Sequence, residues 1–477
     1  MRPLCLAVLL PYFVVGSLAA NGQESAAKPT DAGLSLTYAG KLQAVNSDDD
    51  SSARSFTLNF IVTEITPTGG CRLAWILKEG AGRPRLSWAQ RFGTVPVNKS
   101  LANTSDRELP AIQAERDGSV RAIALRLPFF AAAEPLKTGA AWEQGQLKFE
   151  VNGREDVSGR KCWRVGVTSR GGQREVVWVD EQDAVITRHR EFVVLGQGVA
   201  HELSLDLEKI QSLSAGEIAR QAKAHAALVS LRGPVKDKLS EWQSAGPAAN
   251  AELLQRAKTA LAEIQAEIKN HTIAELAGDA VRETQSAVNR EADLNKFRDK
   301  LVGKPAQDLF QKTLISTRGN KISLADFKGK PTVLHFWEYR SEPKIAPYGE
   351  TGYLDFIWRQ REKQGVQVLG IAVDERADRV RPDLEGAGKI QNNQSAARKD
   401  IRSFCDFMNL SYPVGFDDGP EKLIDLFGDP RQVGGKLPLY IVIAPDGTVA
   451  EYHPGLWSGS ADEGLKELDQ RLTKLLK

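Results

Sequence analysis

The stretch TVLHFWEYRSEPK at residues 332–344 begins with a mostly apolar run and ends in polar residues. A short apolar run of this kind predicts a strand that is buried on both faces of a sheet. Two more such runs follow, VQVLGIAVD at 366–374 and LPLYIVI at 437–443. Helical patterns separate or follow these runs, at about 347–363, 404–408 and 462–476. Buried strands that alternate with helices predict an α/β domain with a mainly parallel sheet over residues 301–477.

Three short motifs in this region occur in a recognisable order. LADFKGKP at 324–331 directly precedes the first buried strand, Leu437-Pro438 opens the third, and Pro445-Asp446-Gly447 predicts a hairpin turn. Together they resemble the thioredoxin superfamily, above all the extracytoplasmic thiol–disulfide reductases of the TlpA and ResA type within the wider AhpC/TSA group. The resemblance implies a thioredoxin-like fold in which Leu437-Pro438 is a cis peptide bond beside the redox site.

The redox motif of this family has no cysteines in the present sequence. In the family, Phe-Trp is followed by three residues and then by Cys-x-Pro-Cys. Aligned on Phe336-Trp337, Ser341 takes the place of the attacking cysteine, Pro343 matches the proline and Lys344 takes the place of the resolving cysteine. Thiol exchange needs a thiolate at a helix N-terminus and a second thiol that releases the mixed disulfide. We therefore expect no catalytic residue at Ser341 or Lys344, and interpret Ser341 as a helix N-cap.

The same resemblance implies a peptide-binding role. In the family the cis-proline loop offers backbone hydrogen bonds to an extended peptide, in the manner of strand addition. Tyr339, Arg340, Ser341 and Glu342 would face Pro438 and contact that peptide. We expect the partner to be an extended peptide or an envelope protein, with the domain acting as a binding or scaffolding module.

An enzymatic alternative depends on the remaining thiols. Cys405 is the only cysteine of the α/β region, and it lies on an expected helix between Phe404 and Phe407, which is typical of core packing. The peroxidatic pattern Pro-x-x-x-Thr-x-x-Cys of the wider group is absent. A thiol–disulfide oxidoreductase or peroxiredoxin-like enzyme would have to use Cys405 or the pair Cys71 and Cys162.

Residues 33–213 show a different periodicity. Phe56, Leu58, Phe60 and Val62 alternate with polar neighbours, which is typical of half-buried antiparallel strands. The pattern predicts a β-rich domain, either a sandwich or a half-barrel. The stretch 162–188 resembles the periplasmic lipoprotein-carrier half-barrels, which fold one antiparallel sheet around an apolar groove. That resemblance implies a second alternative function, the carriage of apolar ligands or lipoproteins.

Residues 215–300 are rich in Ala, Glu, Lys, Gln and Leu and predict helices. Glycine–proline steps at 233–234 and 246–247 divide the stretch. One apolar stripe at helical spacing comprises Leu254, Ala257, Leu261, Ile264 and Ile268. We interpret the stretch as a helical spacer between the β-rich and α/β domains.

Residues 1–20 predict a secretory signal peptide. Arg2 supplies a positive charge, an apolar run covers 4–18, and Ser17-Leu18-Ala19 provides small residues for cleavage. Pro11 interrupts the run, which is shorter than the roughly 20 apolar residues that a membrane span needs. We therefore expect export to the periplasm or the extracellular space, with no transmembrane span after cleavage. Disulfides persist there, and Cys71 and Cys162 are the candidates for a bridge.

The composition excludes several classes of function. The formal net charge of +2 indicates no strongly basic surface for nucleic acid. The six histidines show no metal-binding spacing, and there is no phosphate-binding glycine loop. We expect no metal and no cofactor, and interpret His201 and His335 as core histidines whose ring nitrogens are hydrogen-bonded.

Overall fold

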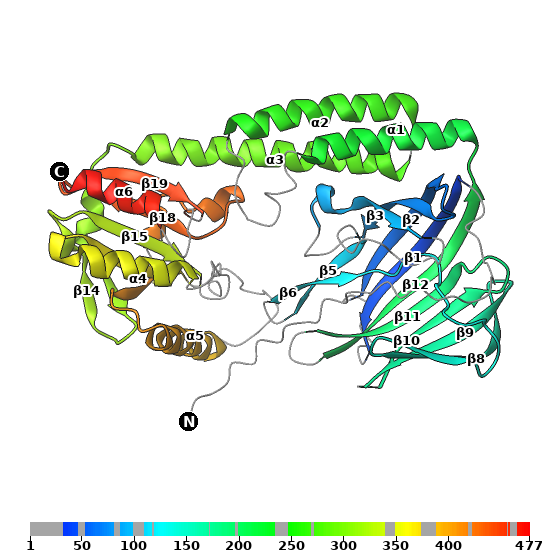
Figure 1. Cartoon of the computed structure of the whole chain (residues 1–477). Helices are drawn as coiled ribbons and strands as arrows, with labels where there is room; N and C mark the ends of the chain where they lie inside the picture. The colour runs from blue at the N-terminus through cyan, green and yellow to red at the C-terminus, as the bar shows by residue number, and fades with distance from the viewer. Residues whose placement is uncertain are drawn as a thin grey trace. The chain divides into compact units, whose positions relative to one another are not determined.

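A computed structural model gives the fold of the chain (Figure 1). It describes residues 32–45, 53–80, 86–98, 109–116, 119–170, 172–195, 199–233, 247–268, 271–338, 349–373, 388–417, 422–455, 457 and 465–477. The chain divides into two compact units. The first unit comprises Met1–Ser230 with Ala260–Ala280, and the second comprises Leu231–Thr259 with Val281–Lys477.

The first unit is built on one ten-stranded sheet, which confirms the predicted β-rich domain. Its strand order is β4-β3-β2-β1-β12-β11-β10-β9-β8-β7, and every neighbouring pair is antiparallel. A separate hairpin pairs β5 with β6. The single curved sheet, visible in Figure 1, fits a half-barrel better than a sandwich. The strands are β1 Leu34–Ala44, β2 Arg54–Ile65, β3 Cys71–Glu79, β4 Phe92–Val97, β5 Ala111–Arg116, β6 Ser119–Ala124, β7 Ala141–Gln144, β8 Leu147–Val157, β9 Arg160–Ser169, β10 Gly172–Asp180, β11 Ile186–Leu195 and β12 Val199–Ser212.

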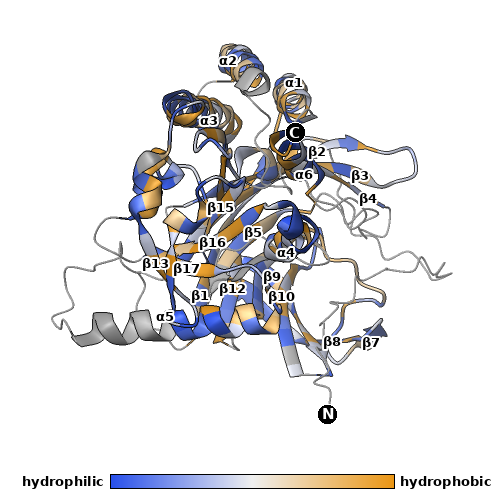
Figure 2. Ribbon diagram, turned by 90° about the vertical axis from the view of Figure 1, so that its left-hand side faces the viewer, coloured by the Kyte–Doolittle hydropathy of each residue, from blue (hydrophilic) through white to orange (hydrophobic). Residues whose placement is uncertain are grey.

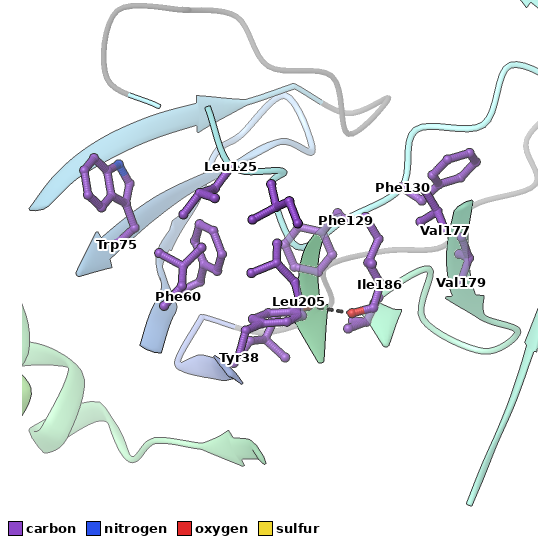
Figure 3. Close-up of a cluster of buried hydrophobic side chains, with 14 of the residues drawn as sticks. Tyr38, Phe60, Trp75, Leu125, Phe129, Phe130, Val177, Val179, Ile186 and Leu205 are labelled. Carbon is purple, nitrogen blue, oxygen red and sulfur yellow. Dashed lines mark hydrogen bonds between the residues drawn. The ribbon is translucent and has the colours of Figure 1, made fainter. Parts of the chain in front are cut away.

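The inner face of this sheet is apolar and is covered by the chain itself. Alternate residues of the strands point to that face because side chains along a strand alternate between its two sides. The segment 125–130, which we call the covering segment, lies against it (Figure 3). The Ile186 N–H donates to the Pro128 carbonyl at 2.8 Å, and the Phe130 N–H donates to the Ala184 carbonyl at 3.0 Å. The apolar groove expected of a half-barrel is therefore occupied by Leu125, Phe129 and Phe130.

Three helices follow, as predicted: α1 Ala215–Arg232, α2 Pro247–Glu267 and α3 Thr272–Leu301. The predicted apolar stripe lies on α2, where Ala257 and Ile264 are each 1% exposed. The helical stretch is shared between the units, because the first unit ends at Ala280 within α3 and the second resumes at Val281. Among the described residues, no helix combines the length and the apolar character needed to cross a bilayer.

The second unit has a seven-stranded sheet of order β14-β13-β17-β16-β15-β18-β19 with helices, which confirms the α/β class. The expected mainly parallel sheet is wrong, because only β15–β16 and β16–β17 pair in parallel. Tight turns such as Pro445-Asp446-Gly447 force the strands that they join to run antiparallel. The elements are β13 Thr313–Ser316, β14 Lys321–Ser323, β15 Thr332–Trp337, α4 Gly349–Arg361, β16 Gln367–Val373, α5 Gly388–Phe407, β17 Val414–Asp417, β18 Leu439–Ile443, β19 Val449–Pro454 and α6 Lys466–Leu475.

Both faces of β15 are buried, as its mostly apolar run predicts. Leu334 and Phe336 belong to the core on one face, while Val333 and Trp337 belong to the core on the other, with residues of α4 and α6. Figure 2 shows the hydrophobic colouring of the central strands β15, β16 and β17. The end of β15 is consequently held rigidly, and this strand leads directly to the site described below.

Candidate functional site

The end of β15 and the start of β18 lie at the same edge of the sheet. Phe336 pairs with Leu439 in antiparallel register, so Glu338 and Leu437 follow at this edge. The Leu437-Pro438 bond is cis, which confirms the prediction. The Gly455 N–H donates to the Pro438 carbonyl at 2.7 Å and ties the proline to the chain after β19.

An ion-pair cluster links the end of β15 to the loop that precedes Pro438. Arg431 lies on a short 3₁₀ helix, η9 Pro430–Val433, and its Nη1 donates to Glu338 Oε1 at 2.6 Å. Its Nε and Nη2 donate to Asp429 Oδ2 at 2.9 and 2.6 Å. Burial disfavours the charged guanidinium, but the hydrogen bonds and charges of Asp429 and Glu338 prevail and raise the pKa of Arg431. The cluster therefore fixes the spacing between the strand end and the cis-proline loop.

Two further cationic side chains, Lys436 and Arg290, belong to the surroundings of the cis-proline loop. Lys436 stands two residues before Pro438, and burial together with the neighbouring Arg290 guanidinium lowers the pKa of Lys436. Arg290 belongs to α3, which packs against the loop through Phe297. The Phe297 ring lies so close to Gly428 that an added Cβ would be 2.7 Å from it, and Gly428 also has a left-handed φ of +76°.

A buried polar pair lies beside the core that contains Val333, Trp337 and Tyr440. His335 Nε2 of β15 is 3.8 Å from Glu350 Oε2 in the first turn of α4, and the two side chains are at most 1% exposed. The Tyr440 ring stacks on the imidazole with centroids 4.7 Å apart. Within the described ranges neither ring nitrogen of His335 has a hydrogen-bond partner, so the expectation of a satisfied histidine is wrong. Burial lowers the pKa of His335 to about 3, and the imidazole is neutral at physiological pH.

Comparisons with known proteins match the C-terminal part of the chain. Residues 302–452 match the model of the AhpC/TSA family. The thiol-disulfide oxidoreductase ResA of Bacillus anthracis is 27% identical over 160 residues, which cover 34% of this chain and 72% of ResA. ResA of Bacillus cereus is 24% identical over 174 residues, which cover 36% of this chain and 78% of that protein. The C-terminal part of this chain is a thioredoxin-like domain of the TlpA/ResA type.

Two solved structures are also similar to the thioredoxin-like domain. A secreted disulfide oxidoreductase of Mycobacterium tuberculosis, homologous to Escherichia coli DsbE, is 18% identical with a TM-score of 0.24, over 35% of this chain and 99% of that one. The bacterioferritin comigratory protein of Xanthomonas campestris is 17% identical with a TM-score of 0.26, over 36% of this chain and 98% of that one.

Most of the predicted site residues lie outside the described residues. These are Tyr339, Arg340, Ser341, Glu342 and Lys344. Their roles, including the N-cap role of Ser341, stay predictions. Of the predicted set, the structure describes Pro438, which lies at the sheet edge beside the end of β15.

The structure does not bring Cys71 and Cys162 together. They lie on β3 and β9, with β2, β1, β12, β11 and β10 between these strands, and both are free thiols. Cys71 belongs to the core on the inner face, whereas Cys162 Sγ is 3.1 Å from Thr187 Oγ1. The expected bridge is therefore wrong. Burial raises the pKa of the Cys71 thiol to about 11 and also raises that of Cys162, which makes both poor nucleophiles.

Cys405 lies half-buried on α5 and packs against the core that contains Trp337, in keeping with its interpretation as a packing residue. In the part of the chain that the structure describes, no cluster of His, Cys, Asp or Glu is arranged to hold a metal ion.

Sequence reasoning missed the charged residues of the site: Glu338, Asp429, Arg431, Lys436 and Arg290. One local signal was available, because an Asp followed by Pro is typical of the N-terminus of a helical turn. Asp429 does cap η9 by accepting from the Arg431 N–H at 2.9 Å. The partnership of Arg431 with Glu338 spans 93 residues of sequence, and no pattern in the sequence reveals it.

Proposed function

We propose that this chain is exported and that its thioredoxin-like domain binds an extended peptide of a partner protein in the cell envelope, without thiol–disulfide chemistry. One observation carries the proposal. The cis Leu437-Pro438 loop, which binds peptides in this family, is present. Counted from Phe336-Trp337, Ser341 and Lys344 are expected at the positions of the redox cysteines, which supports the proposal.

The contacts around the loop support a rigid binding edge. The Pro438 carbonyl is held by the Gly455 N–H, and Arg431 ties the preceding turn to Glu338 at the end of β15. A loop fixed on both sides loses little conformational entropy when a peptide strand is added to it, which favours binding.

Export is part of the proposal and rests on the signal-like residues 1–20, which lie outside the described residues. The periplasm or the extracellular space is the proposed location. There the protein meets unfolded or extended segments of other exported proteins, the class of partner that a cis-proline loop suits.

The alternative is a thiol–disulfide oxidoreductase or a peroxiredoxin-like enzyme, and the names of the similar proteins favour it. It requires a reactive thiol. The raised pKa values of Cys71 and Cys162 oppose their use, which leaves the half-buried Cys405. The second alternative, a carrier of apolar ligands, gains support from the single curved sheet. The covering segment opposes it, because Phe129 and Phe130 fill the inner face.

A disulfide-reduction assay on the chain lacking residues 1–20 tests the redox part of the proposal. We expect no turnover from the wild type. The double variant Ser341→Cys with Lys344→Cys should gain turnover, and its new thiol should titrate below the ordinary pKa of about 8.5. Wild-type turnover that disappears in Cys405→Ala would instead establish the enzymatic alternative.

Capture of partners from an envelope extract tests the binding part. Tyr339→Ala should lose proteins that the wild type retains, because Tyr339 is predicted to face the cis-proline loop. A matched variant, Tyr38→Phe, removes a hydroxyl in the first unit and should leave capture unchanged. Equal capture by the wild type and Tyr339→Ala would contradict the assignment of the binding edge.

A further inference from the structure

The cis-proline loop, residues 428–438, rests at its start on two aromatic side chains. Phe297 comes from α3 and Tyr452 from β19, and their ring centroids are 6.3 Å apart. A Cβ added to Gly428 would lie 2.7 Å from Cδ1 of Phe297, and the Tyr452 hydroxyl donates to the Gly428 carbonyl at 3.1 Å. Burial raises the pKa of Tyr452, which keeps this hydroxyl protonated and able to donate. Gly428 is therefore held by a ring contact and by a hydrogen bond.

From Gly428 a continuous series of contacts leads to the end of β15. Asp429 follows Gly428 directly, caps η9 and accepts from the Arg431 guanidinium at 2.9 and 2.6 Å. Arg431 in turn donates to Glu338 at 2.6 Å. A shift of Gly428 would move Asp429 and, with it, the guanidinium that joins the loop to the strand end. The position of Gly428 thus affects the whole binding edge.

The end of α3 that carries Phe297 lies outside the region that matches the AhpC/TSA family, which begins at residue 302. It nevertheless belongs to the same compact unit as the loop. Phe297 packs against the core that contains Phe336, and Arg298 Nε donates to the Tyr452 carbonyl at 3.5 Å. The helical stretch that the sequence presents as a spacer therefore contributes a side chain to the support of the loop.

We propose that α3 is part of the peptide-binding site and that Phe297 is a positioning residue for the cis-proline loop. This inference rests on the proposed function. The Phe297 ring fills the space beside Gly428, whose left-handed φ of +76° a glycine adopts without strain. A turn that is ordered before the peptide arrives loses less conformational entropy on binding. Phe297 acts through Gly428 and Asp429 rather than by touching the peptide.

Peptide affinity and loop order are measured on the same variants of the chain lacking residues 1–20. The probe is a fluorescein-labelled octapeptide of alternating Ser and Val, followed by fluorescence anisotropy, and capture from envelope extract gives a second measure of binding. Hydrogen–deuterium exchange of fragments that contain residues 428–438 and Gly455 reports loop order, because the Gly455 N–H donates to the Pro438 carbonyl. Phe297→Ala should weaken binding about tenfold, the effect of ordering roughly one more residue on binding, and should speed exchange in both fragments.

Three further variants separate positioning from general stability. Phe310→Ala is the matched control, because Phe310 packs against the same core but lies beside Gly447, beyond the end of β18 that is distant from Pro438. It should lose stability in urea as Phe297→Ala does and keep the wild-type affinity. The conservative variant Phe297→Leu should recover most of the affinity. Gly428→Ala leaves Phe297 in place but adds a Cβ against its ring, and should weaken binding as Phe297→Ala does.

The outcomes separate this inference from the proposed function. Wild-type binding and exchange in Phe297→Ala overturn the positioning role and leave the peptide-binding function standing. An equal loss of affinity in Phe310→Ala also overturns it, because the effect would then come from the stability of the core. Failure of the wild type to bind the octapeptide, together with equal partner capture by the wild type and Tyr339→Ala, overturns the proposed function and this inference with it.

Discussion

Each unit buries a histidine in the middle of a strand, but the two histidines have different neighbours. In the first unit, His189 Nε2 of β11 lies 2.9 Å from Glu175 Oε2 of β10, within hydrogen-bonding distance. In the second, His335 of β15 lies 3.8 Å from Glu350 and stacks on Tyr440. The first histidine is thus satisfied at Nε2 although its Nδ1 has no hydrogen-bond partner among the described residues, whereas neither ring nitrogen of the second has one.

The network of the first unit holds the covering segment to the sheet. Arg126, within that segment, donates through Nε and Nη2 to Glu175 Oε2 at 3.0 and 2.7 Å. Burial raises the pKa of Glu175, but the Arg126 charge and the His189 contact outweigh it and lower the value to about 2. A buried polar group that is satisfied fixes one arrangement of the chain, whereas a buried group that is not satisfied costs stability. Glu175 with its partners therefore supports the fold of the first unit, whereas the unsatisfied His335 opposes the folding of the second.

The largest loss of stability should come from Glu175→Gln, which tests whether the polar network around Glu175 supports the first unit. The substitution keeps the shape of the side chain but removes the carboxylate that accepts from Arg126 and contacts His189, which leaves Glu191 as the remaining carboxylate near both. Removing one partner of a buried ion pair costs about 3–5 kcal/mol. We expect the first unit to lose about 3 kcal/mol of unfolding free energy, measured by urea unfolding with hydrogen–deuterium exchange of β10 and β11 peptides.

Glu64→Gln is the matched control in the same sheet. Glu64 and Arg72 form a surface pair at 3.6 Å, and both side chains are more than half exposed. An exposed pair is worth roughly 0–1 kcal/mol, so this variant should unfold almost as the wild type does. Similar losses for Glu64→Gln and Glu175→Gln would show that the burial of Glu175 has no special effect on stability.

The next largest effect is a fall in the stability of the second unit at low pH, and it tests the role of the buried His335. The unfolded chain protonates His335 near pH 6.5, whereas the folded chain does so only near pH 3. Between these values the unfolded state binds one proton more, so the stability of the second unit falls as the pH falls. The loss is about 1.4 kcal/mol per pH unit, or about 2 kcal/mol from pH 6.5 to pH 5. Urea unfolding at the two pH values, followed by exchange of β15 and β16 peptides, measures it.

His335→Leu should remove this part of the pH dependence, since leucine does not titrate. His453→Gln is the control, because His453 of β19 is only half-buried and the variant leaves His335 in place. It should retain the wild-type slope. If His335→Leu keeps the full loss between pH 6.5 and pH 5, another group in the second unit causes the acid sensitivity.

The sequence predicts features that depend on neighbouring residues better than contacts between residues that lie far apart in the chain. The strand β15 and most of the helices depend on neighbouring residues and were predicted, although α5 begins at Gly388, before the expected 404–408. The cis bond at Leu437-Pro438 was implied by the family resemblance. The order of strands in the ten-stranded sheet depends on contacts between distant residues, so the separation of β3 from β9 had no signature in the sequence. The same holds for the site cluster, where Arg431 meets a carboxylate 93 residues away. The unsatisfied state of His335 was missed because an apolar strand pattern does not show what surrounds a ring.

The smallest effect should come from reductant, and it tests whether packing and polar contacts alone hold the first unit together. Cys71 and Cys162 are free thiols on opposite faces of the sheet, so dithiothreitol has no bond to break. We expect identical thermal unfolding with and without it. Alkylation of the unreduced, denatured chain should label Cys71, Cys162 and Cys405 fully. A native bridge is worth about 2–5 kcal/mol, so its presence would lower the unfolding temperature on reduction and leave two cysteines unlabelled. That result would mean that a covalent link, in addition to packing and polar contacts, holds the first unit together.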